Sequence, residues 1–444
     1  MGAGEAIPFR SVVERPRQPD ENGTEEKGMT TATSVWEILG AAADRDPFLP
    51  AATVLFLCAV VHALAAPGFA RWARRREARR ADFGAAVLHL LGEVEAVFGL
   101  WSIALCLLAV CWPGKGWSFA LAYLESGDYA AAMAGQPVVG PSKFVEPLFV
   151  FIVMALSSTR PIIEAARRLL CAVAGGFGGS VAARWFVVLT LAPLSGSLIT
   201  EPAAMTIAAT LLSAQFYALK PSSSLKYATL ALLFVNVSVG GALTHFAAPP
   251  VVMVAGRWGW GTAEVFRQFG WAALSTVLIS NVLYFLWFRR ELRALDPVAK
   301  DIPVDLEPTV PWWVTAVHVL LIAWTVGMLS AHRPLLMIGG LLLGMAFGKA
   351  TPKWQSHWSL RPPLMVGFFL AGLVVLGGLQ AWWLGPVIAQ LGELPLLAAS
   401  VGLTAFNDNA AIVYLAAQVP SLSEPSAAAL RQAVLAGALA GGGL

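Results

Sequence analysis

Long apolar runs separated by short charged segments follow one another along most of this chain. Examples are "PFLPAATVLFLCAVVHALAAPGFA" (47–70), "WAALSTVLISNVLYFLWF" (271–288) and "LMVGFFLAGLVVLGGLQAWWL" (364–384). Each is close to the ~20 residues that a helix needs to cross a bilayer. The pattern predicts membrane elements at about 48–70, 85–112, 144–169, 226–256, 270–288, 311–330, 334–349 and 363–386.

Two further segments, about 184–217 and 395–419, are too long for one crossing. Proline or polar residues interrupt both, in "SLITEPAAMTI" (197–207) and in "GLTAFNDNAAIVYL" (402–415). We expect two re-entrant hairpins, because non-helical backbone at membrane depth must be buried in protein or line a wet cavity.

Basic segments fix the expected orientation, because Lys and Arg in short loops stay in the cytoplasm. "RWARRREARR" (71–80) and "RRELR" (289–293) are the clearest such segments. With both inside, the first hairpin enters from the cytoplasm and the second from outside. The two halves of the chain then run in opposite directions.

The sequence itself contains traces of this inverted repeat. "TEPAAM" (200–205) can be laid on "NDNAAI" (407–412), and "GGAL" (240–243) then falls on "GGGL" (441–444). Inverted repeats with interrupted helices that meet at mid-membrane are typical of secondary transporters. "GGAL" continues as the second part of a broken helix, whereas no residues follow "GGGL", so we expect a second repeat that is shortened at its C-terminus.

The expected organisation has four parts. Residues 1–46, a mixture of charges, Gly and Pro, are expected to be disordered. The first repeat spans 47–288, with its hairpin at 184–217 and its broken helix at 226–256. A cytoplasmic linker at 289–310 leads to the second repeat at 311–444, with its hairpin at 395–419.

Composition supports an all-α polytopic membrane protein. Of 444 residues, 57% are apolar and 13% charged, against a usual charged share of about 25%. The motifs HExxH, GxSxG and GxxxxGK[ST] do not occur, so we expect no enzyme, no catalytic residues, no cofactor and no nucleic-acid partner. Transport would then be driven by ion gradients.

Two acids, Glu201 and Asp408, lie at the tips of the expected hairpins. A carboxylate at the bilayer centre costs roughly 2.5 kcal/mol or more, so it persists where it meets water, a cation or a partner. We expect Na+ at Glu201 and Asp408, in competition with protons, with Thr200, Asn407 and Asn409 as neighbouring ligands. The alternative is that each acid pairs with a basic residue and only stabilises the fold.

The broken helix "NVSVGGALTHFAAPP" (236–250) offers further groups. The glycine and proline pairs bracket backbone that cannot all be helical, and its freed carbonyls could complete the site. The expected contributors are Asn236, Gly240, Gly241, Thr244 and, as a proton relay, His245. Close helix packing is the alternative explanation for the glycines, and a hydrogen bond to backbone is the alternative for the histidine.

A second acidic group occurs in "HLLGEVEAVFGLW" (89–101). His89 and Glu93 would share one helix face, with Glu95 pointing elsewhere. These three residues could form a proton path across the membrane. Structural pairing with Arg160 or another base explains them equally well.

The "LITEPAAMT", "VGGALTHFAAPP", "HLLGEVEAVFGLW" and "LTAFNDNAAIVYL" stretches together resemble the "Putative Na+/H+ antiporter" family of bacterial membrane proteins. The resemblance covers most of 48–444. It extends to the wider ion-transporter superfamily, which includes sodium–dicarboxylate carriers and arsenite permeases. It implies a scaffold domain, commonly a dimer interface, and a moving transport domain.

Members of that superfamily often carry Ser-Asn-Thr at both tips. Here the tips read Thr200-Glu201-Pro202 and Asn407-Asp408-Asn409, and acids in place of neutral groups favour cations or protons over an anionic substrate. The missing continuation after "GGGL" departs from the family pattern.

We therefore expect a multi-pass protein of a bacterial cytoplasmic membrane that exchanges Na+ (or Li+) for protons. Its expected partners are the lipid bilayer, small cations and a second copy in a homodimer. Two alternatives stay open: a sodium-coupled symporter of a small anion such as a carboxylate, and a non-transporting scaffold or receptor.

Overall fold

The structure is a computed structural model that describes residues 34–78, 82–135, 142–295 and 309–443. Every regular element within these ranges is a helix. Seven helices are long and apolar enough to cross a membrane, or up to nine spans if each of two bent pairs counts as one. The all-helical, multi-pass class expected from the sequence is confirmed.

The membrane-length elements and their neighbours have these bounds: α2 (Phe48–Glu77), α4 (Val94–Cys111), α7 (Val145–Ser157), α8 (Arg160–Gly176), α9 (Val181–Ile199), α10 (Glu201–Gln215), α11 (Ser223–Gly240), α12 (Pro249–Trp258), α14 (Trp271–Ala294), α16 (Trp312–Ser330), α17 (Pro334–Ala350), α18 (Arg361–Gly377), α19 (Ala381–Ile388), α20 (Glu393–Thr404), α21 (Asn409–Ala417) and α22 (Ala428–Gly441).

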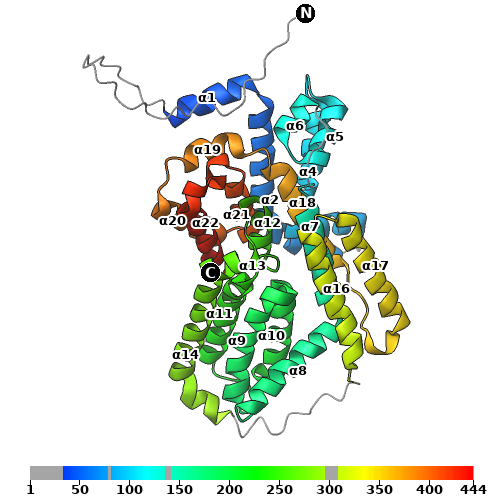
Figure 1. Cartoon of the computed structure of the whole chain (residues 1–444), viewed down its shortest axis with the longest axis vertical. Helices are drawn as coiled ribbons and strands as arrows, with labels where there is room; N and C mark the ends of the chain where they lie inside the picture. Colours follow the sequence, from blue (N-terminus) through cyan, green and yellow to red (C-terminus); the bar gives the residue numbers. More distant parts are fainter. Residues whose placement is uncertain (1–33, 79–81, 136–141, 296–308, 444) are drawn as a thin grey trace, which may run out of the picture.

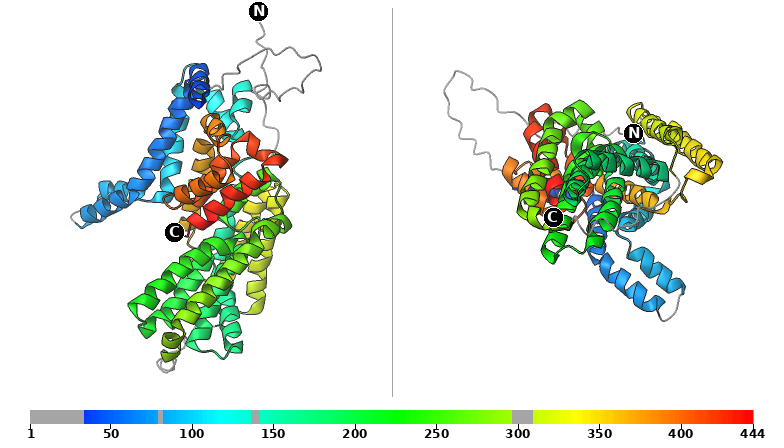
Figure 2. Two further views of the ribbon diagram at one scale, coloured as in Figure 1. Left: turned by 90° about the vertical axis from the view of Figure 1, so that its left-hand side faces the viewer. Right: turned by 90° about the horizontal axis from the view of Figure 1, so that it is seen from below.

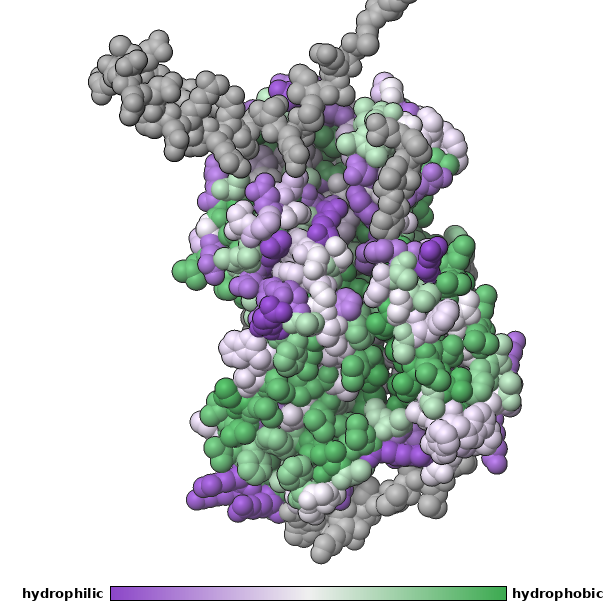
Figure 3. All heavy atoms as spheres, viewed as in Figure 1, coloured by the Kyte–Doolittle hydropathy of each residue, from purple (hydrophilic) through white to green (hydrophobic). Residues whose placement is uncertain are grey.

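Burial separates interior helices from helices that face lipid. In α2, 22% of the most apolar stretch is buried, against 56% in α9 and in α11. Large apolar side chains are exposed on α14, α16 and α17, among them Trp287, Leu320 and Leu342. Figure 3 shows hydrophobic residues gathered over the lower part of the molecule with hydrophilic residues beneath them, as expected for a surface that contacts a bilayer.

Buried apolar residues form three clusters, which we call the central core, the first-lobe core and the second-lobe core. The central core, around Phe149 and Leu373, comes mainly from α2, α4, α7, α16, α17 and α18. The first-lobe core, around Trp185, comes from α8 to α11 and α14. The second-lobe core, around Val254 and Leu435, comes mainly from α12, α20, α21 and α22. Figures 1 and 2 show the first lobe below the second.

The third expected membrane element of each half is bent into two helices. The α7–α8 pair bends by 67° and the α18–α19 pair by 77°. Thr159 is extended between α7 and α8, and Pro161 follows in the first turn of α8, a position where proline is tolerated because no helical N–H is lost. The expected membrane elements at 144–169 and 363–386 are therefore each a bent pair of helices.

Another expected crossing, 85–112, consists of two helices. α3 (Phe83–Leu91) ends at Gly92, and α4 begins at Val94. A Cβ at Gly92 would lie 2.6 Å from the backbone nitrogen of Ala70, so only glycine permits this approach to α2. The expectation of one helix through His89 and Glu93 is wrong.

Differences also occur at the edges of the expected domains. α1 (Val35–Arg45) begins with a capping box between Ser34 and Glu37, in the segment 1–46 for which disorder was expected; residues 1–33 lie outside the described residues. α14 continues to Ala294 into the expected linker, most of which also lies outside them.

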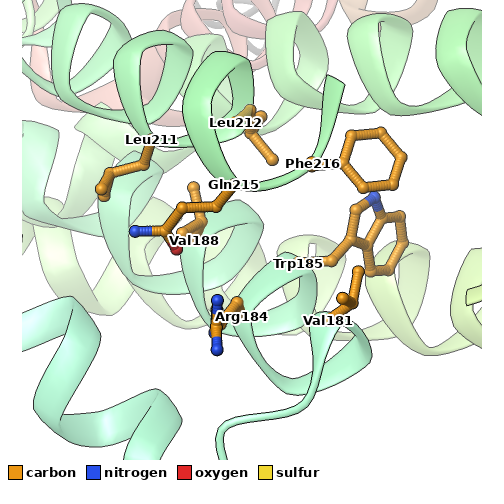
Figure 4. Close-up of a pocket in the computed structure, with 8 residues that line it drawn as sticks. All are labelled: Val181, Arg184, Trp185, Val188, Leu211, Leu212, Gln215 and Phe216. Carbon is orange, nitrogen blue, oxygen red and sulfur yellow. The ribbon is translucent and has the colours of Figure 1, made fainter. Parts of the chain in front are cut away.

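The first expected hairpin is a pair of antiparallel helices, α9 and α10, that meet at Thr200. Residues from the start of α9 and the end of α10, including Trp185 and Phe216, face each other across a shallow apolar pocket (Figure 4). That pocket has no space for a water molecule. α9, and α10 together with the short helical turn that follows it to Leu219, are each long enough to cross a membrane, so the depth of the turn stays a prediction.

The second expected hairpin is arranged differently. α20 packs along α22, and α21 packs along α12, rather than α20 and α21 along each other. Gly437 and Gly441 explain this choice. A Cβ on Gly437 would lie 2.7 Å from the Leu397 carbonyl oxygen, and a Cβ on Gly441 would contact that of Val401. Small residues allow such close approach between membrane helices.

Candidate cation site

The turn between α9 and α10 consists of Thr200 alone, in a strained conformation. Its φ is 78° and its ψ is 151°, a region where a β-branched residue is a rare outlier. Thr200 is buried, and its Oγ1 has no hydrogen-bond partner among the described residues. Backbone strain of this kind costs about 1–3 kcal/mol and concentrates at functional sites.

Glu201 follows directly and opens α10. Its side chain lies against the broken helix: a Cβ at Gly241 would be 2.6 Å from its Oε1. That oxygen is buried and has no partner within the described ranges. Two adjacent residues, Thr200 and Glu201, thus each have a buried oxygen without a partner among the described residues, and such burial is costly.

Ser197 ties the end of α9 to the break between α11 and α12. Its Oγ donates to the Gly240 carbonyl (2.7 Å) and accepts from the Leu243 N–H (2.9 Å). Thr244 Oγ1 donates to the Ser197 carbonyl (2.6 Å). Gly241 thus lies against Glu201, and Gly240 and Thr244 bond Ser197, four residues before Glu201. A role for these three residues in a cation site stays a prediction. Sequence reasoning missed Ser197, although the small, polar "SGS" before the turn was a signal.

Asp408, at the other expected tip, caps a helix. Its carboxylate accepts from the Ala411 N–H at the start of α21 (3.1 Å), and its own N–H donates to Asn407 Oδ1 (2.9 Å). Aspartate is a favoured residue at this position, and the helix dipole stabilises its negative charge. Asn407 therefore positions the backbone at Asp408.

The two acids belong to one electrostatic group. Glu201 and Asp408 are close enough for their charges to interact, and so are Asp408 and Glu95 of α4. Carboxylates in such proximity repel each other when they are ionised, and a cation or proton between them relieves that repulsion. The two expected tips come from segments about 200 residues apart, and a shared site between them stays a prediction.

Asn409 lies where α11, α21 and α22 meet. A Cβ on Gly442 would be 2.9 Å from Asn409 Nδ2 and 2.9 Å from Ser238 Oγ. Ser238 in turn donates to the Leu439 carbonyl (2.9 Å). Asn409 is thus adjacent to the acidic group, and its role as a ligand stays a prediction.

Asn236 takes part in a different structure, one turn of α11 away from the break. Pro193 lacks an N–H, so the Leu189 carbonyl loses its partner within α9. Asn236 Nδ2 (2.9 Å) and Asn281 Nδ2 (3.0 Å) donate to that carbonyl instead. Asn281 also bonds Thr190 Oγ1 (2.8 Å). The side chain of Asn236 is used by this buried network.

His245 lies in the segment between α11 and α12, after Thr244. Its Nδ1 is 2.6 Å from Thr262 Oγ1, and the histidine lines a cavity of about 230 Å3 between α7, α12 and α16. Its role as a proton relay stays a prediction.

The expected proton path of His89, Glu93 and Glu95 is divided. His89 pairs with Glu77 (2.9 Å), and Glu93 pairs with Arg361 of α18. Glu93 thus pairs with another base, Arg361, as the structural alternative to a proton path allowed. Of the three residues, Glu95 is the one whose charge acts on Asp408.

Within the described residues, no three His, Cys, Asp or Glu side chains are arranged to hold a metal ion. A cation at Glu201 would therefore take most ligands from hydroxyl and backbone oxygens. Such oxygen ligands suit hard cations, whereas transition metals favour nitrogen and sulfur.

Comparison with known sequences assigns the family. No curated protein matches the chain. Residues 48–444 match the family described as "Putative Na+/H+ antiporter". This match spans the helices and the carboxylate site described above, and it agrees with the resemblance noted in the sequence. The chain is thus a multi-pass membrane protein that belongs to the Na+/H+ antiporter family of that description.

Proposed function

We propose that this protein exchanges Na+ (or Li+) for protons, and that Glu201 and Asp408 bind the two in turn. The observation that carries the proposal is that the adjacent residues Thr200 and Glu201 have buried oxygens, Oγ1 and Oε1, without partners among the described residues, and that Glu201 Oε1 lies against Gly241 of the broken helix. A buried polar group without a partner requires an explanation, such as an absent ion. We further propose that the site lies in the cytoplasmic membrane of a bacterium.

Competition for one carboxylate produces the exchange. A cation that binds Thr200 and Glu201 displaces the proton, and a proton that binds displaces the cation. Because the two are mutually exclusive, each passage across the membrane carries one or the other. Asp408, at the start of α21, adds a second carboxylate that attracts either ion. Inverted repeats, with the two lobes moving past the central core, would supply alternating access.

The test uses purified protein in liposomes that contain a pH-reporting dye, with the membrane potential clamped. Addition of Na+ outside should drive protons out and make the interior alkaline. Glu201→Gln and Asp408→Asn should each abolish this signal, because each removes a negative charge. Asparagine is as good a helix cap as aspartate, so Asp408→Asn preserves the start of α21.

Glu393→Gln in α20 is the matched control and should exchange normally. Normal exchange in Glu201→Gln at equal abundance would contradict the site. Sodium uptake that requires an added carboxylate would indicate a symporter instead, and failure of any cation to change the thermal stability of the protein would indicate a non-transporting scaffold.

A further inference from the structure

A cavity outside the carboxylate site has an unassigned role. It measures about 230 Å3 and is partly open; the walls come from the start of α7, the end of α12 and the end of α16. A site needs only about 10–15 Å3 of such space to hold a water, so this cavity has room for several waters or a hydrated cation.

Polar side chains are present in the walls, on segments that are distant in sequence. They are Glu146 on α7, His245 beside the break, Ser330 at the end of α16, and His332. The Glu146 carboxylate faces Gly256 on α12, where even a Cβ would be 3.6 Å from its Oε1. A carboxylate in the wall of a wet cavity with apolar surroundings concentrates cations there.

The cavity adjoins the site through the chain itself. His245 follows Thr244, whose hydroxyl bonds Ser197, and it is four residues from Gly241, which touches Glu201. At 3.8 Å per residue this path is at most about 15 Å long. Thr262 engages His245 Nδ1, and Nε2 has no hydrogen bond among the described residues.

We propose that this cavity is the outer entrance through which a cation reaches Glu201, with Glu146 attracting the cation and His245 between the cavity and the helix break. The positive-inside orientation places the start of α7 and the ends of α12 and α16 at the outer surface. The competing explanation is that Glu146 only balances Arg257, whose charge is close enough to act on it. The inference rests on the proposed function.

The first experiment measures how fast charged reagents react with a cysteine in the cavity wall, and it does not depend on transport. Ser330→Cys is made in a chain whose cysteines, Cys58, Cys106, Cys111 and Cys171, are replaced by serine. Right-side-out vesicles are treated with methanethiosulfonates that carry either a trimethylammonium or a sulfonate group. The cationic reagent should react about tenfold faster than the anionic one, and Glu146→Gln should remove most of this preference.

Ala331→Cys, at the adjacent exposed residue outside the cavity, is the matched control and should show little preference. The second experiment measures exchange after labelling: modified Ser330→Cys should lose sodium-driven proton movement, and modified Ala331→Cys should keep it. Equal rates for both reagents, a preference unchanged by Glu146→Gln, or full exchange after labelling at Ser330→Cys would each overturn the inference. Charge-selective labelling in a protein that exchanges no cation even unmodified would contradict the proposed function and leave the cavity assignment standing.

Discussion

Thr200 combines a strained backbone with an unsatisfied hydroxyl, and substitution can separate the two. Alanine and glycine both remove the oxygen, but only glycine adopts φ 78° without strain. We expect the free energy of unfolding of Thr200→Gly to exceed that of Thr200→Ala by about 1 kcal/mol, so the glycine variant unfolds at a higher temperature. Both variants should lose exchange. Thermal unfolding and the liposome assay measure these quantities.

Thr200→Ser keeps the oxygen and should retain most of the exchange activity. An alanine variant more stable than the glycine variant would show that the turn adopts another conformation. Exchange that persists in both variants would remove Thr200 from the cation site.

Gly241 leaves space for the Glu201 carboxylate. A Cβ there would be 2.6 Å from Oε1 and 2.8 Å from Cγ, so Gly241→Ala forces the end of a flexible side chain to move. We expect a small loss of stability and a rise of about tenfold or more in the Na+ concentration for half-maximal exchange, equivalent to about 1.4 kcal/mol of binding.

Gly327→Ala in α16 is the control, because nothing lies within 4 Å of the added Cβ. It should leave exchange unchanged and, through helix propensity, should not lower stability. An unchanged sodium dependence in Gly241→Ala would place the cation away from Glu201.

At the scale of elements, Pro193 inside α9 leaves the Leu189 carbonyl to two asparagines, Asn236 and Asn281. Asn281→Leu should lower stability by about 1 kcal/mol, the usual worth of a hydrogen bond between membrane helices. In a Pro193→Ala background the cost should be smaller, because the N–H of the new alanine supplies the Leu189 carbonyl from within the helix. A double-mutant cycle of unfolding temperatures measures this coupling; equal costs in both backgrounds would contradict it.

Hydropathy predicted which segments form membrane helices, and the polar interruptions predicted the turn at Thr200. The bends could be predicted only in part. Thr159 and Pro161 are a helix-start signal that the apolar run concealed. At the bend before α19, the side chain of Gln380 accepts a hydrogen bond from Thr53 of α2. A distant partner of this kind leaves no local pattern.

The sequence also did not predict which helices pack against α20 and α21. α20 and α21 are adjacent in the chain, and that adjacency suggested a hairpin. The glycines of α22 allow a closer approach to α20, so packing determines the partner. In the same way, Asp408 was expected as a ligand from its position, but its role as a helix cap requires the backbone geometry of α21.

At the scale of the whole molecule, the two carboxylates are associated with different hydrophobic cores. The candidate site is at the edge of the first lobe, and Asp408 belongs to the junction of the second lobe and the central core. Residues of α21 contribute to both of those cores. A displacement of either lobe against the central core would therefore change the separation of the carboxylates, as the proposed exchange mechanism requires.

α12 also constrains the synthesis of the protein. It follows α11 in the chain, yet Val251, Val254 and Trp258 are buried in the second-lobe core among residues of α21 and α22. On the ribosome, α12 emerges more than 150 residues before those partners. Its apolar face, which includes Trp258, therefore lacks its native packing partners until the second half has been translated and inserted. In nascent chains arrested before α21, the apolar face of α12 would therefore be accessible to lipid, chaperones and proteases.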